Sequence, residues 1–565
     1  MSRVGQRYDG AWPAVVDLLV RSGVDTCFGL PGDDLELLRA LDAAGVDLVP
    51  CRDQRNAVYM AAGYALQSGR PGVCALGKGP AVTHAATGIL EARESGAPVL
   101  LLGAGTPERT RGSGAFQELD QVAAVGPLVR WAYRVAHPDR VVPAAAKALA
   151  LTSGPPAGPV YLEIADDVRT AEIVRTGPWP TAAQPLPDLS APLTSGPAVE
   201  SILASRRPVV LVGGGMRHHN PDGAVERFAG RLDAALFTTA SGRGAVDERH
   251  PLFCGVAGLY AAAPARELFS SCDLVISLAG RLEETVTEGG TPWPAVPVVQ
   301  VNISPGDLSA EHPGPRVVGD ARRALLAWSR ALDEAHRGAR GAPTEAWGRE
   351  IAVARKAMIA DADAERADAA DLPGVRIAEV LAALDATASG PRVLVAENGL
   401  QDMWCYCYPF HTGGGSVVPS EQTPLGFGAA AAIGVKRAAP HHEVTAFIGD
   451  GAFLAARADI EATARSHGGV LYVVLCNGGY GWLDAQRARL GLDAERHRFT
   501  SPGAPPPTIA ESDLYHRVLR DKDTLTDELR AARRVCAQGR TAVLMVPVSP
   551  DDIAPPIRDA EVVPQ

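Results

Sequence analysis

Residues 444–481 read VTAFIGDGAFLAARADIEATARSHGGVLYVVLCNGGYG, and this stretch indicates the fold. Two apolar runs, Val444–Ile448 and Val470–Leu475, have the length and composition of buried strands. A segment of helix length, Leu454–Ser466, lies between them. Such a strand–helix–strand unit places its two strands parallel in one sheet. The stretch therefore predicts an α/β fold with parallel strands.

A polar, glycine-rich turn follows each of these strands: GDG at 449–451 and NGG at 477–479. Because the carboxyl ends of neighbouring parallel strands meet at one edge of the sheet, we expect Asp450 and Asn477 to lie close together. A carboxylate, an amide oxygen and the backbone carbonyl of Gly479 are hard oxygen ligands. Such ligands suit a Mg²⁺ ion that also binds a phosphate.

The same turns suit a diphosphate. Gly449 and Gly451 let the backbone approach a phosphate, and the helix N-terminus expected at Ala452–Phe453 offers N–H groups and a positive dipole. Either turn taken alone is more often an ordinary glycine turn than a binding site. Their spacing on adjacent strands favours a binding site over that alternative.

The pattern of an apolar strand ending in an unusual loop recurs along the chain. Because ligands bind beyond the carboxyl ends of parallel strands, we expect these loops to line one edge of each sheet. The strands expected are Thr26–Phe28, Val46–Pro50, Gly72–Leu76, Pro98–Leu102, Pro208–Val212, Asp273–Leu278, Val296–Ile303 and Val393–Val395.

Two breaks divide the chain. Gly177–Pro197 is rich in Pro, Ser and Thr and lacks periodicity, and Arg337–Pro343 is a second break, followed by a polar helical stretch. We predict three doubly wound domains with parallel sheets at residues 1–176, 198–336 and 372–565, with linking segments at 177–197 and 337–371. In the middle domain GGGM does not match GxGxxG, so a plain Rossmann-like structural domain is favoured over a dinucleotide site.

Composition excludes several classes of protein. The 565 residues are 46% apolar and 21% charged, as in ordinary globular proteins, and the net charge of −11 argues against nucleic-acid binding. We find no apolar stretch long enough to cross a membrane and no signal peptide, so we expect a cytoplasmic protein. The nine cysteines are scattered and form no CxxC pair, which indicates neither a disulfide framework nor a zinc site.

With GDG followed about 27 residues later by Asn477, the chain resembles the thiamin-diphosphate enzymes of the acetolactate synthase, pyruvate oxidase and pyruvate decarboxylase group. The resemblance covers nearly the whole chain. The matching stretches, in order, are FGLPGD (Phe28–Asp33), NAVYMAAGYALQSGRPGV (Asn56–Val73), FQELDQ (Phe116–Gln121), LAGRLEETVTEGG (Leu278–Gly290) and PLGFGAAAAIG (Pro424–Gly434).

The resemblance implies a pyrimidine-binding, a central and a diphosphate-binding domain, in that order. It implies a homodimer or homotetramer whose active site lies between the pyrimidine domain of one subunit and the diphosphate domain of another. Asp450, Asn477 and the Gly479 carbonyl would hold Mg²⁺. Leu425, unless it is an ordinary core leucine, would prop the cofactor into a bent form, and the Thr423 carbonyl would accept a hydrogen bond from its aminopyrimidine. The residues lining the diphosphate would be Asn398, Gly399, Leu400, Gln401, Gly449, Gly451, Ala452 and Tyr480.

One position departs from the family. A glutamate is expected nine residues before Gly63, where this chain has Gln54. In the family that glutamate exchanges a proton with the cofactor's pyrimidine N1′ and so promotes formation of the nucleophilic ylide. Gln54 can form a hydrogen bond with N1′ but cannot readily pass a proton. The adjacent Asp53 could substitute, but a helix cap for the helix beginning near Arg55 is the favoured interpretation.

Four further residues are candidates for the active site. Asp33 matches the active-site aspartate of pyruvate decarboxylases, or is a turn or cap residue. His84 could transfer protons near neutral pH, or is an ordinary histidine in the first turn of a helix. Phe116 and Gln117 match the substrate-channel pair of acetolactate synthases, or take part in helix packing.

The leading hypothesis is an enzyme that uses thiamin diphosphate and Mg²⁺ on a pyruvate-like 2-oxo acid, with loss of CO₂, carboligation to a second carbonyl, or both. Glyoxylate carboligase, a relative within the family, also lacks the glutamate, so Gln54 does not exclude turnover. The alternatives are a catalytically silent, cofactor-binding paralogue and a flavin-dependent oxidase that binds FAD.

Overall fold

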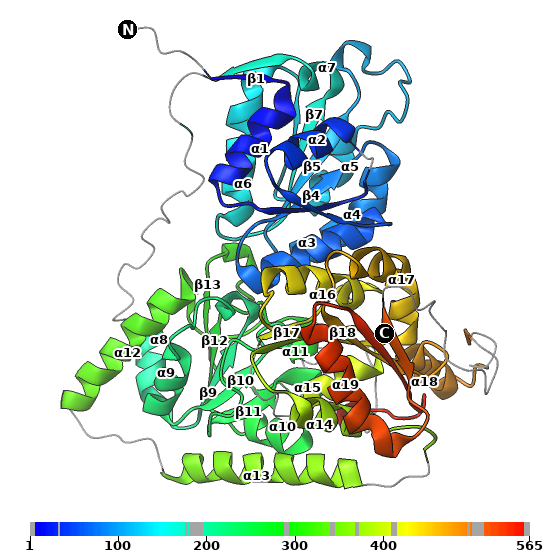
Figure 1. Ribbon diagram of the computed structural model, residues 1–565. Helices are drawn as coiled ribbons and strands as arrows, with labels where there is room; N and C mark the ends of the chain where they lie inside the picture. Colours follow the sequence, from blue (N-terminus) through cyan, green and yellow to red (C-terminus); the bar gives the residue numbers. More distant parts are fainter. Residues whose placement is uncertain are drawn as a thin grey trace.

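The computed structural model describes residues 6–31, 34–175, 179, 196–287, 293–338, 345–367, 372–407, 415–493, 498–499 and 514–558. Figure 1 shows three α/β units, each built on a sheet with helices packed against it. Each sheet has six strands, and the neighbouring strands within it are parallel. The predicted class of three doubly wound domains is therefore confirmed. Most of Gly177–Pro197 and of Arg337–Pro343 lies outside the described residues. Of the limits assigned to the linking segments, 197/198 falls at the start of a helix, Pro197–Ala204, and 336/337 falls inside another, Ala321–Gly338.

The first and third domains share one strand order. The first sheet runs β3-β2-β4-β5-β7-β6 and the third runs β16-β15-β17-β18-β20-β19, so each reads 2-1-3-4-6-5 when numbered within its own domain. The order reverses between the first and third strand of each sheet, which is where open α/β sheets bind ligands. The strands are β2 (Thr26–Gly29), β3 (Asp47–Pro50), β4 (Gly72–Leu76), β5 (Val99–Gly105), β6 (Trp131–Val135), β7 (Val160–Ala165), β15 (Arg392–Ala396), β16 (Gly415–Val417), β17 (Glu443–Gly449), β18 (Val470–Cys476), β19 (Tyr515–Val518) and β20 (Ala542–Pro547).

The middle sheet runs β11-β10-β9-β12-β13-β14, which is 3-2-1-4-5-6 within its domain and is the Rossmann order. A short antiparallel ribbon of β1 and β8 lies on the first domain. The strands of these two sheets are β1 (Gln6–Asp9), β8 (Glu172–Arg175), β9 (Pro208–Val212), β10 (Ala235–Thr238), β11 (Phe253–Val256), β12 (Leu274–Leu278), β13 (Val298–Asn302) and β14 (Arg316–Val318).

Helices cover both faces of the sheets, which explains why the central strands are continuous apolar runs and do not alternate with polar residues. None of the described helices is long and apolar enough to cross a membrane. The helices are α1 (Ala11–Arg21), α2 (Leu35–Ala43), α3 (Gln54–Ser68), α4 (Pro80–Glu94), α5 (Gln121–Val125), α6 (Val141–Ser153), α7 (Asp166–Arg169), α8 (Pro197–Ala204), α9 (Ala224–Leu232), α10 (Ala263–Ser270), α11 (Glu284–Thr287), α12 (Ala321–Gly338), α13 (Glu345–Ala367), α14 (Ile377–Thr387), α15 (Leu400–Cys407), α16 (Phe427–Ala438), α17 (Asp450–Ala464), α18 (Gly481–Arg489), α19 (Leu525–Ala537) and α20 (Pro555–Arg558).

The crossover helix after GDG begins earlier than the sequence predicted. Its expected first turn was Ala452–Phe453, whereas α17 begins at Asp450 and Gly449 is its N-cap. The polar residues of the turn therefore form the first turn of the helix itself. This places Asp450 directly at the positive end of the helix dipole.

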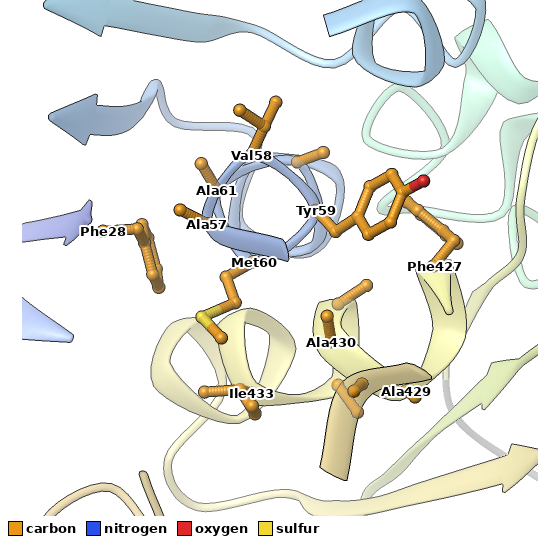
Figure 2. Packing of buried hydrophobic residues seen from close by; sticks show 14 of the residues in the cluster. Phe28, Ala57, Val58, Tyr59, Met60, Ala61, Phe427, Ala429, Ala430 and Ile433 are labelled. Atoms are coloured by element: carbon orange, nitrogen blue, oxygen red, sulfur yellow. The ribbon is translucent and has the colours of Figure 1, made fainter. Parts of the chain in front are cut away.

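The first and third domains pack together through α3 and α16, which lie against each other in Figures 1 and 2. Their facing residues are mostly small, because α16 contains four consecutive alanines, Ala429–Ala432. A Cβ atom on Gly434 would clash with the carbonyl oxygen of Met60, and one on Gly63 would clash with that of Ala431. The glycines of the two family-like stretches thus allow the two backbones to approach closely.

Candidate active site

The predicted cofactor residues meet at the reversal point of the third sheet. The segment 398–401 follows β15, Asp450 follows β17, and Asn477 follows β18. Since β17 pairs with both β15 and β18 in parallel, the three loops lie side by side at one edge of the sheet. The expected juxtaposition of Asp450 and Asn477 is confirmed by this pairing.

The Asp450 carboxylate joins two of these loops and is 4% exposed. Its Oδ1 accepts a hydrogen bond from the Gly451 N–H at 3.0 Å, and its Oδ2 accepts one from the Gly478 N–H at 2.8 Å. Burial raises the pKa of this carboxyl to about 6. The carboxylate forms no ion pair with any residue that the structure describes. A buried carboxylate in this state is costly unless a cation joins it, so the site fits a metal ion.

The neighbouring groups supply further oxygens. Asn477 Oδ1 accepts a hydrogen bond from the Gly479 N–H at 3.1 Å. The edge of the Tyr480 ring packs against Phe499, and a Cβ atom on Gly451 would lie 2.9 Å from Tyr480. Among the described residues, no three His, Cys, Asp or Glu side chains gather to hold a metal. A cation at Asp450 would therefore depend on amide and carbonyl oxygens and on the oxygens of its ligand.

The loop after β15 is held by its own side chains. Gln401 Nε2 donates to the carbonyl oxygens of Asn398 (2.8 Å) and Glu397 (3.1 Å), and the Gly399 N–H donates to Asp402 Oδ1 at 3.1 Å. Leu400 is buried at the start of α15. Gln401 thus stabilises the backbone beside the turns 449–451 and 477–479, which we call the Asp450 cradle.

Thr423 and Leu425 lie on the segment that leads into α16. Leu425 is 39% exposed, which rules out the alternative of an ordinary core leucine. Thr423 has φ +39, a left-handed conformation that is unfavourable for a β-branched residue and that the surrounding structure must hold in place. The Thr423 carbonyl accepts a hydrogen bond from Asn398 Nδ2 at 3.3 Å, which joins this segment to the loop after β15.

Glu397 holds the end of this segment and was missed by sequence reasoning. Its carboxylate is fully buried and accepts from the N–H groups of Gly426 (2.9 Å) and Gly428 (2.8 Å). The only sequence signal was an acidic residue directly after a buried strand. Glu397 thereby fixes the start of α16 directly after Leu425.

We predict that Glu397 makes stability depend on pH. Burial raises its pKa from 4.5 to about 7, so between these values the folded chain binds a proton that the unfolded chain does not. The contribution of Glu397 to the free energy of unfolding therefore falls by about 3 kcal/mol as pH rises from about 4.5 to about 7. Denaturant unfolding across this range should show a shallower pH dependence for Glu397→Gln than for the wild type. Parallel pH curves for the two proteins would contradict the prediction.

Gln54 is the first residue of α3 and is 7% exposed. Asp53 is the N-cap and accepts from the Arg55 N–H at 2.8 Å, which confirms the helix-cap interpretation of Asp53. The Asp459 carboxylate of α17 accepts hydrogen bonds from the Arg52 N–H (2.6 Å), before this helix begins, and from Asn56 Nδ2 (2.7 Å), in its first turn. Asp459 lies nine residues after Asp450, about 13 Å along the helix. Within one chain, the start of α3 is therefore next to the middle of α17 and away from the Asp450 cradle.

The other candidates of the first domain lie at its own sheet edge or outside the described residues. Phe116 is 81% exposed and Gln117, with φ +60, is exposed as well. Both lie in a loop, and the next α-helix, α5, begins only at Gln121. The helix-packing alternative is therefore wrong. His84 is exposed in the first turn of α4. Asp33 lies outside the described residues, and its neighbour Asp34 caps α2.

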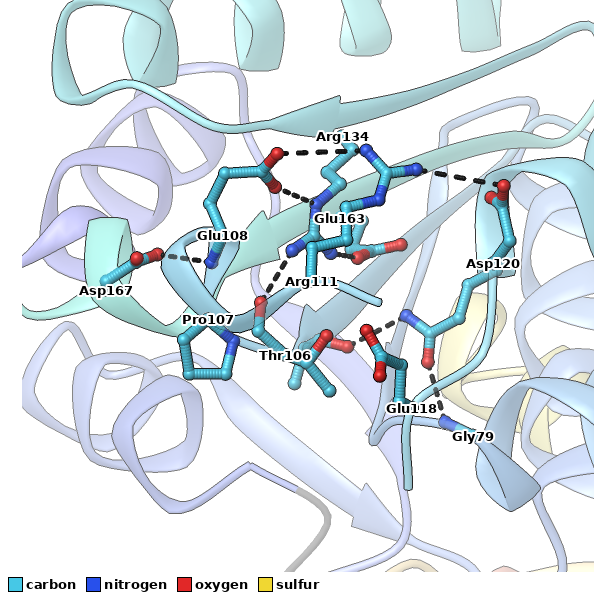
Figure 3. Close-up of polar contacts among 12 residues, drawn as sticks. Gly79, Thr106, Pro107, Glu108, Arg111, Glu118, Asp120, Arg134, Glu163 and Asp167 are labelled. Atoms are coloured by element: carbon cyan, nitrogen blue, oxygen red, sulfur yellow. Dashed lines mark hydrogen bonds and ion pairs between the residues drawn. The ribbon is translucent and has the colours of Figure 1, made fainter. Parts of the chain in front are cut away.

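A polar network holds this loop in place (Figure 3). Gln121 Oε1 accepts from the Gly79 N–H at 2.6 Å and its Nε2 donates to the Ala104 carbonyl at 3.0 Å. The Glu118 carboxylate accepts from the N–H groups of Gly112 and Gly114. These contacts link the loop after β4 to the loop after β5. They were not predicted, because no motif marks them.

In the middle domain the glycines are explained by packing. A Cβ atom on Gly213, directly after β9, would clash with the carbonyl of Ala279 and with Gly280, which follow β12. The reversal point of this sheet is thus occupied by the chain's own backbone. This contact favours the structural interpretation of GGGM over a dinucleotide site.

A cavity of about 870 Å³ lies at the opposite edge of the third sheet. Its basic residues include Lys436, Arg534 and His467. They surround the C-terminal ends of α16, α17 and α19, whose dipoles are negative there. The negative helix ends account for the basic side chains that line the cavity. The cavity is remote from the predicted site residues.

Three models of protein families match the chain. Their descriptions are thiamine pyrophosphate enzyme, N-terminal TPP binding domain (residues 12–124), central domain (196–328) and C-terminal TPP binding domain (398–546). A probable 2-ketoarginine decarboxylase, AruI, of Pseudomonas aeruginosa is 30% identical over 83% of this chain and 82% of its own length. A probable acetolactate synthase large subunit of Methanocaldococcus jannaschii is 29% identical over 78% and 76%. A sulfoacetaldehyde acetyltransferase of Rhodobacter capsulatus is 29% identical over 97% and 95%.

Proposed function

Since the chain belongs to the thiamine pyrophosphate enzyme family and is a carboligase or lyase of its acetolactate synthase and decarboxylase group, we propose that it acts on a pyruvate-like 2-oxo acid with Mg²⁺ as metal. The central support is the buried Asp450 carboxylate, which lies beside Asn477 at the reversal point of the third sheet. Among the described residues, no positively charged side chain pairs with it. The relatives include both a decarboxylase and acetolactate synthases by name, so loss of CO₂ and formation of a new carbon–carbon bond are both proposed.

The chain's own residues would bind and orient the cofactor. Asp450, Asn477 and the Gly479 carbonyl would hold Mg²⁺, and the N-terminus of α17 would face the diphosphate. When bound, thiamin diphosphate supplies a nucleophilic carbon and an electron sink for decarboxylation of a 2-oxo acid. Leu425, which is not part of the core, is available to support the bent form of the cofactor.

Gln54 would hold the pyrimidine ring by a hydrogen bond without exchanging a proton. This substitution is the one observation that favours the alternative of a silent, cofactor-binding paralogue. Against that alternative stand the retained Asp450 and Asn477 turns and the three relatives reported above, each named as an enzyme. We therefore propose an active enzyme whose cofactor is activated without the usual glutamate.

We further propose a homo-oligomer with the active site between subunits. Within one chain, the helix start that carries Gln54 contacts Asp459, about 13 Å along α17 from Asp450. The cradle and the loops of the first domain also expose large apolar side chains, as expected of surfaces that a second subunit covers. These residues are Leu35, Phe116, Leu119, Leu425, Tyr480 and Leu483.

The experiment is product analysis of the purified protein. It is supplied with thiamin diphosphate, Mg²⁺ and single 2-oxo acids, alone and with aldehyde acceptors, and products are identified by mass spectrometry. From the acid alone, the proposal predicts CO₂ with either an aldehyde or an acetohydroxy acid, the latter by addition to a second molecule of the acid. With an aldehyde acceptor it predicts CO₂ and a hydroxy-ketone. Recovery of unchanged substrates from every mixture, with the cofactor bound, would contradict it.

A further inference from the structure

The segment that carries Thr423 and Leu425 is held from outside its own domain. Glu91 of α4, in the first domain, is 0% exposed and forms no ion pair with a described residue. Its Oε1 accepts from the Ser420 N–H at 2.8 Å, and its Oε2 accepts from Ser420 Oγ at 2.6 Å. Because both oxygens of this buried carboxylate accept hydrogen bonds from one residue, they fix the position of that residue.

Ser420 passes this constraint on to Thr423. Ser420 Oγ accepts from the Gln422 N–H at 3.1 Å, and the Ser420 carbonyl accepts from the Thr423 N–H at 3.0 Å. The turn closed by these bonds contains Thr423 at φ +39. Such a conformation persists only where its surroundings enforce it.

The far end of the segment also contacts the first domain. Tyr59 of α3 packs edge-on against Phe427, the first residue of α16, with 5.6 Å between ring centroids (Figure 2). Between the two contacts, Thr423 and Leu425 are the residues assigned to the cofactor. The first domain therefore contacts both ends of the segment, whereas Glu397 of the third domain holds only the end that leads into α16.

We propose that Glu91 is a positioning residue of the active site: through Ser420 it sets the conformation of Thr423 and Leu425, and so the placement of the cofactor's pyrimidine half. This inference rests on the proposed function. Because the diphosphate half is assigned to Asp450 and Asn477, loss of the Glu91 contact is expected to affect one half of the cofactor site only.

The test compares Glu91→Gln and Ser420→Ala with Glu94→Gln. Glu94 lies on the same helix but pairs with Arg281 in a partly exposed ion pair, so it serves as the control. Dissociation constants of pyrophosphate and of thiamin diphosphate, each with Mg²⁺, are measured by calorimetry beside the rate of CO₂ release and the thermal unfolding midpoint. The two test variants should bind thiamin diphosphate about tenfold more weakly and turn over about tenfold more slowly. Pyrophosphate binding should change less than about twofold in both, and Glu94→Gln should match the wild type.

Two results would overturn the inference. One is wild-type cofactor binding and turnover in Glu91→Gln with only a lower unfolding midpoint, because that describes a purely structural contact. The other is equal weakening of pyrophosphate and thiamin diphosphate. If Glu91→Gln does not fold, Ser420→Ala decides on the same criteria. A wild-type protein that binds no thiamin diphosphate refutes the proposed function itself, which keeps the two failures distinct.

Discussion

Replacement of Asp450 by asparagine is expected to weaken Mg²⁺-dependent binding of thiamin diphosphate by at least about 100-fold and to remove turnover. Asparagine keeps the size of the side chain and one of the two oxygen acceptors for the Gly451 and Gly478 N–H groups. It removes the only negative charge among the proposed metal ligands. Calorimetric titration of the cofactor, with and without Mg²⁺, measures the effect.

A matched control is available on the same helix. Glu461 pairs with Arg457 on the exposed face of α17, and Glu461→Gln should bind the cofactor as the wild type does. Unchanged Mg²⁺-dependent affinity in Asp450→Asn would show that the metal is held elsewhere. The assignment of Asn477 and Gly479 as its partners would then be wrong as well.

Replacement of Gln54 by glutamate is expected to accelerate deuterium exchange of the bound cofactor's C2 proton by about 10²–10⁴-fold, the usual contribution of a general acid or base. Glutamate can exchange a proton with the pyrimidine ring, whereas the Gln54 amide cannot. Quenched exchange followed by NMR of the released cofactor gives the rate.

The neighbouring carboxylate provides the comparison for this variant. Asp53→Asn removes the carboxylate that precedes Gln54 in the sequence, and Asp53 is already engaged as the cap of α3. We expect it to leave the exchange rate unchanged. An exchange rate in Gln54→Glu equal to that of the wild type, with the cofactor bound, would show that residue 54 does not face the pyrimidine ring.

The sequence was sufficient where function depends on short, ordered motifs. The strands that end at Asp450 and Asn477 were predicted from apolar runs and glycine turns, and their pairing followed from one right-handed crossover. The start of α17 was misplaced because GDG was taken as a turn before the helix. The structure makes it the first turn, with Gly449 as the cap.

The supports of the site could not be predicted. Glu91 and Ser420 are 329 positions apart, and neither stands in a motif that indicates a contact. Glu397 and Gln121 likewise act on backbone N–H groups, which carry no sequence signature. The Glu91–Ser420 contact also depends on how the first and third domains pack through α3 and α16, which no local sequence pattern indicates.

The most direct test of the account is CO₂ release by the wild-type protein from a panel of 2-oxo acids, with cofactor occupancy measured in the same samples. The account predicts CO₂ release that requires thiamin diphosphate and Mg²⁺ although residue 54 is glutamine. No CO₂ from any acid, in protein shown to be fully occupied by the cofactor, would contradict it and would leave a cofactor-binding protein without catalysis.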